Sequence, residues 1–111
     1  MTVVAVRIGA CFPEPKAEWA LDTWLSPDDC GRLVESFLTT DASGFHVIWG
    51  VSRNADRWWS LAEAAAVGFD PRDDAARYEG LVPPTDAESA QTDGLIGKTF
   101  CTHPLGEPMR R

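Results

Sequence analysis

Residues 3–8 read Val3-Val4-Ala5-Val6-Arg7-Ile8, a mainly β-branched apolar run that ends at Gly9. A short apolar run of this kind, bounded by a glycine, is typical of a strand buried on both faces, and such strands occur in parallel sheets. Only two residues precede the run. We therefore expect a buried strand whose neighbouring strands are supplied by chain upstream of these residues.

A helix is predicted to begin at Pro27. Ser26 is a good N-cap, proline is favoured at the first helical position, and Asp28 and Asp29 place negative charge in the first turn. Capping is also the favoured interpretation of the later pair Asp73-Asp74. Apolar residues then recur at helical spacing and form one stripe: Cys30, Leu33, Val34, Phe37 and Leu38. This stripe is expected to pack against the rest of the fold.

A second strand is predicted over residues 45–51, which read Phe-His-Val-Ile-Trp-Gly-Val. Ser60 and Glu63 then form a capping box for a short alanine-rich helix that ends at Gly68. Residues 73–78 predict one or two further helical turns. The chain thus combines two strands with two to three helices.

The segments outside these elements differ in character. Residues 9–25 contain Pro13 and Pro15 and predict an ordered surface loop, of a length that is often functional. From Gly80 onward, prolines and glycines interrupt every periodicity. We therefore expect residues 1–79 to form the folded segment and residues 80–111 to form a largely disordered tail.

Composition excludes several classes of protein. With 111 residues, 44% hydrophobic and 24% charged, the chain is one globular domain at most and too short for a complete doubly wound dinucleotide-binding fold. Its net charge of −7 disfavours nucleic acid and anionic membrane as partners. No apolar run has the length of a bilayer span, and the N-terminus lacks a basic signal start. Because Cys11, Cys30 and Cys101 are odd in number and far apart, we expect reduced thiols and a cytoplasmic protein.

No cofactor or metal motif is present in the sequence. The nine glycines nowhere form a G-x-G-x-x-G turn, and no Walker loop, H-E-x-x-H or C-x-x-C motif occurs. Cys101 and His103 offer only two ligands, so no metal site is predicted. His46 lies inside a strand pattern without a recognisable catalytic partner, and a structural role is favoured. For Trp58-Trp59, packing against the core is favoured over a stacking platform for a sugar or base.

Five motifs, taken in order, carry a family resemblance. They are Val6–Lys16, Thr23–Asp29, Val47–Ser52, Trp58-Trp59 and Gly68–Ala75. Together they resemble the C-terminal part of uronate dehydrogenases, members of the extended short-chain dehydrogenase/reductase family (NAD-dependent epimerase/dehydratase). The resemblance covers about residues 3–78 and no recognisable part of the tail. It implies an α/β chain that is the C-terminal fragment of a Rossmann-type fold.

The resemblance also implies particular site residues. Ile8 and Cys11 match positions that line the nicotinamide end of the NAD pocket. Two substrate contacts depart from the family: a serine is Ala10 here, and an arginine that would pair with the uronate carboxylate is Trp19. Loss of that guanidinium removes a charge-assisted anchor for an acid sugar. The family's Tyr-x-x-x-Lys pair is absent, because the only tyrosine, Tyr78, is not followed by a lysine four residues later.

Three functions follow as hypotheses. The first is a truncated NAD-dependent sugar (uronate) dehydrogenase or epimerase that keeps part of a substrate pocket but has no catalytic residues or complete NAD site, and is inactive alone. The second is a non-catalytic interaction module, whose unpartnered apolar surface pairs with a second copy or with a separate Rossmann-bearing chain. The third is a small sugar-binding protein that uses Trp58 and Trp59.

Overall fold

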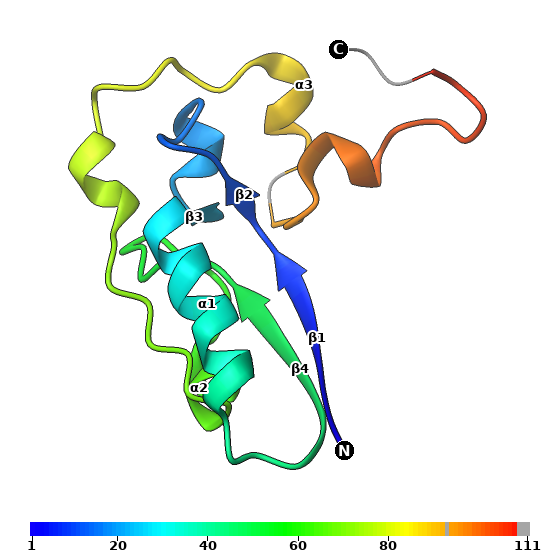
Figure 1. Cartoon of the computed structure of the whole chain (residues 1–111). Coiled ribbons are helices and arrows are strands. Elements are labelled where there is room, and N and C mark those ends of the chain that lie inside the picture. Colours follow the sequence, from blue (N-terminus) through cyan, green and yellow to red (C-terminus); the bar gives the residue numbers. More distant parts are fainter. Residues whose placement is uncertain (93, 109–111) are drawn as a thin grey trace.

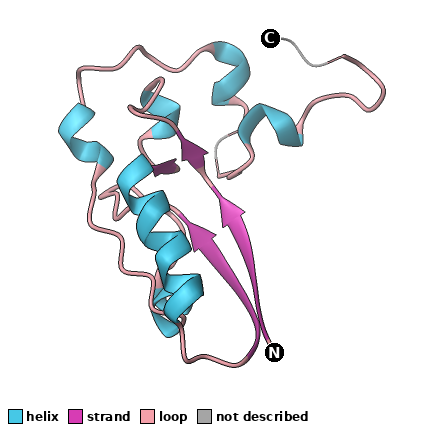
Figure 2. Ribbon diagram, in the orientation of Figure 1, coloured by secondary structure: helices cyan, strands magenta, loops and turns pink. Residues whose placement is uncertain are grey.

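A βαβ unit forms the centre of the computed structural model, which describes residues 1–92 and 94–108. Strands β1 (Thr2–Ile8) and β4 (Gly44–Gly50) pair in parallel, and helix α1 (Pro27–Thr39) belongs to the connection between them. Figures 1 and 2 show the two strands side by side with α1 alongside β4. Parallel strands require such a crossover. The predicted α/β class and both predicted strands are confirmed.

The loop after β1 holds a second, very short parallel pair that sequence periodicity did not predict. Strand β2 (Ala10–Cys11) pairs with β3 (Trp24–Leu25), and the 3-10 helix η1 (Glu18–Ala20) lies between them. Gly9 allows this pairing, because a Cβ at that position would overlap the carbonyl oxygen of Thr23. The backbone therefore crosses directly from the larger sheet to the smaller one.

Helix α1 begins as predicted but presents a narrower apolar face. The Ser26 hydroxyl accepts a hydrogen bond from the Asp29 amide at 2.9 Å, which confirms the cap. Leu33 is buried, whereas Val34 and Leu38 are 51% and 82% exposed, so the predicted five-residue stripe is too wide. In its place Ser36 is buried, with its hydroxyl bonded to the Leu33 carbonyl at 2.6 Å. Of the predicted stripe, Leu33 belongs to the core, and Cys30 and Phe37 pack against it.

One hydrophobic core joins both helices to one face of the sheet. Its buried members are Leu25, Leu33, Ile48, Ala64, Val67 and Phe69, with Val4 and Val6 packed against them. Helix α2 (Ala62–Ala66) ends before Gly68, whose φ of +89° confirms the predicted C-terminal glycine. The predicted capping box does not form: the helix starts after Leu61 without a side-chain cap, and the Ser60 hydroxyl accepts the Ala62 amide at 3.1 Å. Within the described residues no helix is long and apolar enough to cross a bilayer.

The opposite face of the sheet is covered only near Trp49, which packs with the cluster of Trp59 and Leu61, and this corrects the expectation that β1 is buried on both sides. Val3 lies beside Phe45 and Ala5 beside Val47 in the parallel register. Val3, Phe45 and Val47 are 43%, 69% and 38% exposed. The reason is topological, since α1 and α2 both pack on the other face.

The C-terminal stretch, for which a largely disordered tail was predicted over residues 80–111, contains short helices where the structure describes it. After the 3-10 turn η2 (Ala75–Tyr78), which was predicted, it contains α3 (Ala87–Ala90) and the 3-10 helix η3 (Lys98–Cys101). Asp86 caps α3 by accepting the Ser89 amide at 2.7 Å. This local hydrogen bond supports a short helix that no apolar pattern in the sequence indicates. Residues 93 and 109–111 of that prediction lie outside the described part.

Candidate functional site

A cavity of about 450 Å³ lies between the start of the 9–25 loop and the η3 segment. The four residues singled out from the sequence as cofactor or substrate contacts, Ile8, Ala10, Cys11 and Trp19, all line it. The fold thus brings into one cavity residues that a resemblance had grouped by position alone. Their roles in binding remain predictions.

Each of these side chains is placed by a defined element. Ile8 ends β1, and Ala10 and Cys11 form β2, which is held by the 2.9 Å hydrogen bond from the Ala10 amide to the Thr23 carbonyl. Trp19 lies in η1, where the amide of the preceding Glu18 donates to the Pro83 carbonyl at 2.9 Å. The C-terminal stretch therefore braces the site.

The second wall of the cavity comes from residues that sequence analysis assigned to a disordered tail. Ser89 and residues 96–100 line it, including the aromatic ring of Phe100. Lys98 stands here in the left-handed backbone region at φ +49°, which is uncommon for a residue with a side chain. No periodicity or motif marks this segment, so only its fold reveals the contribution.

The charges at the cavity are positive. The chain has two lysines, Lys16 and Lys98, and both line it. Lys98 is only 7% exposed and forms an ion pair with Asp22 at 3.5 Å. The Lys16 ammonium lies 4.2 Å from the centre of the Phe12 ring, a cation–π distance. None of the described lining residues is an aspartate or glutamate.

The surroundings of Cys11 do not favour a nucleophilic role for its thiol. Burial, together with the neighbouring Cys30 thiol that is hydrogen-bonded to it, raises the pKa of Cys11 above its ordinary value. Because the thiolate is the reactive form of cysteine, a raised pKa keeps Cys11 protonated near neutral pH. Its position indicates a lining role.

Tyr78 is also a structural residue in this fold. Its ring packs edge-on against Trp24, with the ring centres 5.4 Å apart, and the Arg77 guanidinium lies 5.0 Å from its centre. It does not line the cavity described above.

His46 likewise has a local role, with Nε2 2.9 Å from the Ser43 carbonyl.

Asp29 has a larger role than the predicted helix cap. It is fully buried and accepts hydrogen bonds from the Ser52 hydroxyl at 2.6 Å and from the amides of Arg72 and Asp73 at 2.8 and 3.0 Å. It thereby ties α1 to the end of β4 and to the 70–74 segment. Asp74 does cap the next turn by accepting the Ala76 amide at 2.9 Å, and it also accepts the Ala55 amide at 3.0 Å.

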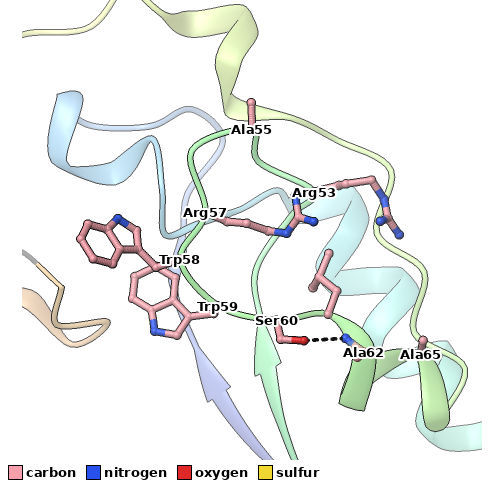
Figure 3. A pocket seen from close by; sticks show the side chains of 9 residues that line it. Arg53, Ala55, Arg57, Trp58, Trp59, Ser60, Ala62 and Ala65 are labelled. Carbon is pink, nitrogen blue, oxygen red and sulfur yellow. Dashed lines mark hydrogen bonds between the residues drawn. The ribbon is translucent and has the colours of Figure 1, made fainter.

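A second, more open cavity of about 650 Å³ contains the tryptophan pair (Figure 3). Trp59 is buried and packs on Trp49, with the ring centres 5.9 Å apart, which confirms the packing interpretation for this residue. Trp58 is 68% exposed. Arg53 and Arg57 line the same cavity, but Arg53 is engaged by Asp70 at 2.7 Å.

The described residues do not fit a whole NAD molecule. A pyrophosphate is normally held by the free amides of a glycine-rich helix N-terminus. At the start of α1 the Asp29 amide is already bonded to Ser26, and the acidic Asp28 and Asp29 stand in the first turn. Ile8 and Cys11 can provide only an apolar wall for one end of such a cofactor. No group of three or more metal-binding side chains occurs in the part of the chain that the structure describes.

Comparisons with known proteins point to sugar dehydrogenases. Uronate dehydrogenase of Agrobacterium fabrum is 34% identical over 103 residues, which are 90% of this chain and 39% of that protein. An NAD-dependent glucose-6-phosphate dehydrogenase of Haloferax volcanii is 34% identical over 90 residues, 78% of this chain and 34% of that protein. The crystal structure of uronate dehydrogenase from Agrobacterium tumefaciens superposes with a TM-score of 0.79 at 32% identity, covering 96% of this chain and 41% of that one. No family model matches.

These matches confirm the resemblance and extend it. A match that covers 90% or 96% of the chain reaches well beyond the predicted residues 3–78 and takes in part of the C-terminal stretch. The chain spans about two fifths of the length of these relatives. It is therefore similar, in sequence and in fold, to a part of uronate dehydrogenase.

Proposed function

We propose that this chain forms the sugar-binding part of an NAD-dependent sugar dehydrogenase. The NAD-binding part and the acid/base pair are then supplied by residues outside this sequence, in the same polypeptide or in a partner chain. The relatives are named as uronate and glucose-6-phosphate dehydrogenases, and the chain matches only a fraction of each. One observation carries the proposal: Ile8, Ala10, Cys11 and Trp19 converge on a single cavity.

The chemistry divides naturally between two such parts. Oxidation of a sugar hydroxyl requires NAD to accept a hydride and a base to accept the hydroxyl proton. The Tyr78 ring is packed against Trp24 and has no lysine four residues later, so it is not that base. The residues of this chain hold the sugar and exclude water from it. The 111 residues alone are thus expected to show no turnover.

Occupation of the cavity by a sugar can be tested through Cys11. In alkylation by N-ethylmaleimide, followed by mass spectrometry, D-glucuronate is expected to slow modification of Cys11. Cys101 provides the matched control, because it is exposed and does not line the cavity. Equal Cys11 alkylation rates with and without saturating sugar would contradict the proposal.

A second role, as an interaction module, is favoured by the uncovered sheet face. Val3, Phe45 and Val47 place three apolar side chains on the side of the sheet that lacks helices. Exposed apolar surfaces of this kind mark protein interfaces. The partner in this proposal is an NAD-binding chain or a second copy. Light scattering after size-exclusion chromatography tests self-association, and a monomer at all concentrations would leave only the separate partner.

A further inference from the structure

Both lysines of this acidic chain line one cavity, although they lie far apart in the sequence. The net charge is −7, and none of the arginines that the structure describes lines this cavity. Lys16 belongs to the 9–25 loop, and Lys98 begins η3. Among the described residues that line this cavity the only charged side chains are these two lysines, which favours an anionic ligand.

Lys98 is the more informative of the two. Its ammonium carries three N–H donors, and its side chain is 8% exposed. Among the described contacts the ammonium has one, to Asp22 at 3.5 Å, which is longer than a normal hydrogen bond. A buried charge is costly unless it is both paired and hydrogen-bonded. Lys98 therefore has donor capacity to offer to a ligand in the cavity.

The backbone at Lys98 supports the same interpretation. A residue with a Cβ is strained at φ +49°, and strain of this kind is often found at ligand-binding sites. Gly97 immediately precedes it and also lines the cavity. Lys98 therefore lines the cavity in an uncommon backbone conformation.

We propose that Lys98, assisted by Lys16 at the exposed side, is the anion-recognising group of the cavity. The ligand is then a sugar that bears a carboxylate or a phosphate. The anionic oxygens accept hydrogen bonds from Lys98, and the rings of Trp19 and Phe100 provide apolar walls for the sugar. This inference rests on the proposed function. Lys98, from the C-terminal stretch, then supplies the positive charge that is missing at position 19, where the family has an arginine and this chain has Trp19.

Binding to the purified full chain tests the inference. Isothermal titration with D-glucuronate, D-glucose 6-phosphate and D-glucose compares a carboxylate, a phosphate and a neutral sugar of similar size. Both anionic sugars are expected to bind, more weakly as salt increases, and glucose at least about tenfold more weakly. The anionic sugar that binds more tightly shows whether the cavity prefers a carboxylate or a phosphate.

Substitutions assign the effect to Lys98. Lys98→Met and Lys98→Gln are both expected to weaken binding of the anionic sugars about tenfold or more, and Lys16→Met less. Arg57→Met, in the other cavity, is the matched control and should leave binding unchanged. Circular dichroism of each variant verifies the fold.

The outcomes separate this inference from the proposed function. If glucose binds as tightly as glucuronate and the lysine variants have no effect, the cavity holds sugars but the anion inference is wrong. If inorganic phosphate binds through Lys98 as tightly as the sugar phosphate, the anion site stands and the sugar function fails. If none of the ligands binds, both are wrong.

Discussion

At the scale of single residues, Asp29 does most to join the parts of this fold. Its buried carboxylate receives donors from Ser52, Arg72 and Asp73, and it also pairs with Arg32. Asp29→Ala leaves these donors without an acceptor and is expected to lower the free energy of unfolding by about 3 kcal/mol. Urea denaturation measures this change. Asp28→Ala, at an exposed position of the same helix turn, should cost less than about 1 kcal/mol.

The same carboxylate makes stability depend on pH. Burial alone would raise the pKa of Asp29, but hydrogen bonds from Ser52, Arg72, Arg32 and Asp73 outweigh burial and lower it. A lowered folded-state pKa means that the stabilisation is complete above the unfolded-state pKa and is lost as pH falls through the folded-state pKa. Denaturation midpoints measured from neutral to strongly acidic pH should fall more steeply for the natural chain than for Asp29→Ala. Parallel curves for the two would show that Asp29 is not the source.

Gly9 provides a second prediction at this scale. Gly9→Ala forces β2 away from β3, because the new Cβ would overlap the Thr23 carbonyl. We expect a loss of about 3 kcal/mol in thermal or urea unfolding. Gly31→Ala is the matched control: it lies within α1 with open space around it, and should stabilise by up to about 1 kcal/mol. A tolerated Gly9→Ala would contradict the close approach of the two strands.

At the scale of elements, the uncovered face of β1 and β4 is expected to control association. Phe45→Lys places a charge on this face and should reduce self-association in light scattering without lowering the free energy of unfolding by more than about 0.5 kcal/mol. Leu38→Lys, which alters an exposed leucine on α1, should leave association unchanged. Equal effects of the two substitutions would indicate general solubility and not a specific face.

The elements show what local sequence can predict. The start of α1 was correct because the cap is a contact between neighbours, from the Asp29 amide to Ser26. The exposure of Val34 and Leu38 could not be predicted, since it depends on how the helix is rotated against the core it covers. The missed strands β2 and β3 contain two residues each, too few for any alternation to be visible.

Only one wall of the cavity could be anticipated from the sequence. The family resemblance singled out Ile8, Ala10, Cys11 and Trp19, and the structure places them in one cavity, while their binding roles stay predictions. Lys98 lies in a stretch broken by glycines and prolines, where no periodicity indicates structure, and its position depends on long-range contacts such as the ion pair with Asp22. Such contacts are invisible to patterns read along the chain.

At the scale of the whole molecule, the cavity is lined by residues from the N-terminal and the C-terminal parts of the chain. Its walls come from the β1–β2 junction and from η3. The sheet leaves one apolar face uncovered, and the relatives are more than twice as long as this chain. The cavity and the exposed apolar face are the two surfaces with which we propose that this chain binds a sugar and packs against a larger, NAD-binding part.

The most direct test is a chimera in which this chain replaces the matching segment of the Agrobacterium fabrum uronate dehydrogenase, assayed by NADH absorbance with D-glucuronate, D-glucose 6-phosphate and D-glucose. We predict NADH formation with an anionic sugar, and no NADH from this chain alone or from the relative without its matching segment. A chimera that folds and binds NAD but oxidises none of these sugars would contradict the assignment of the cavity to sugar binding.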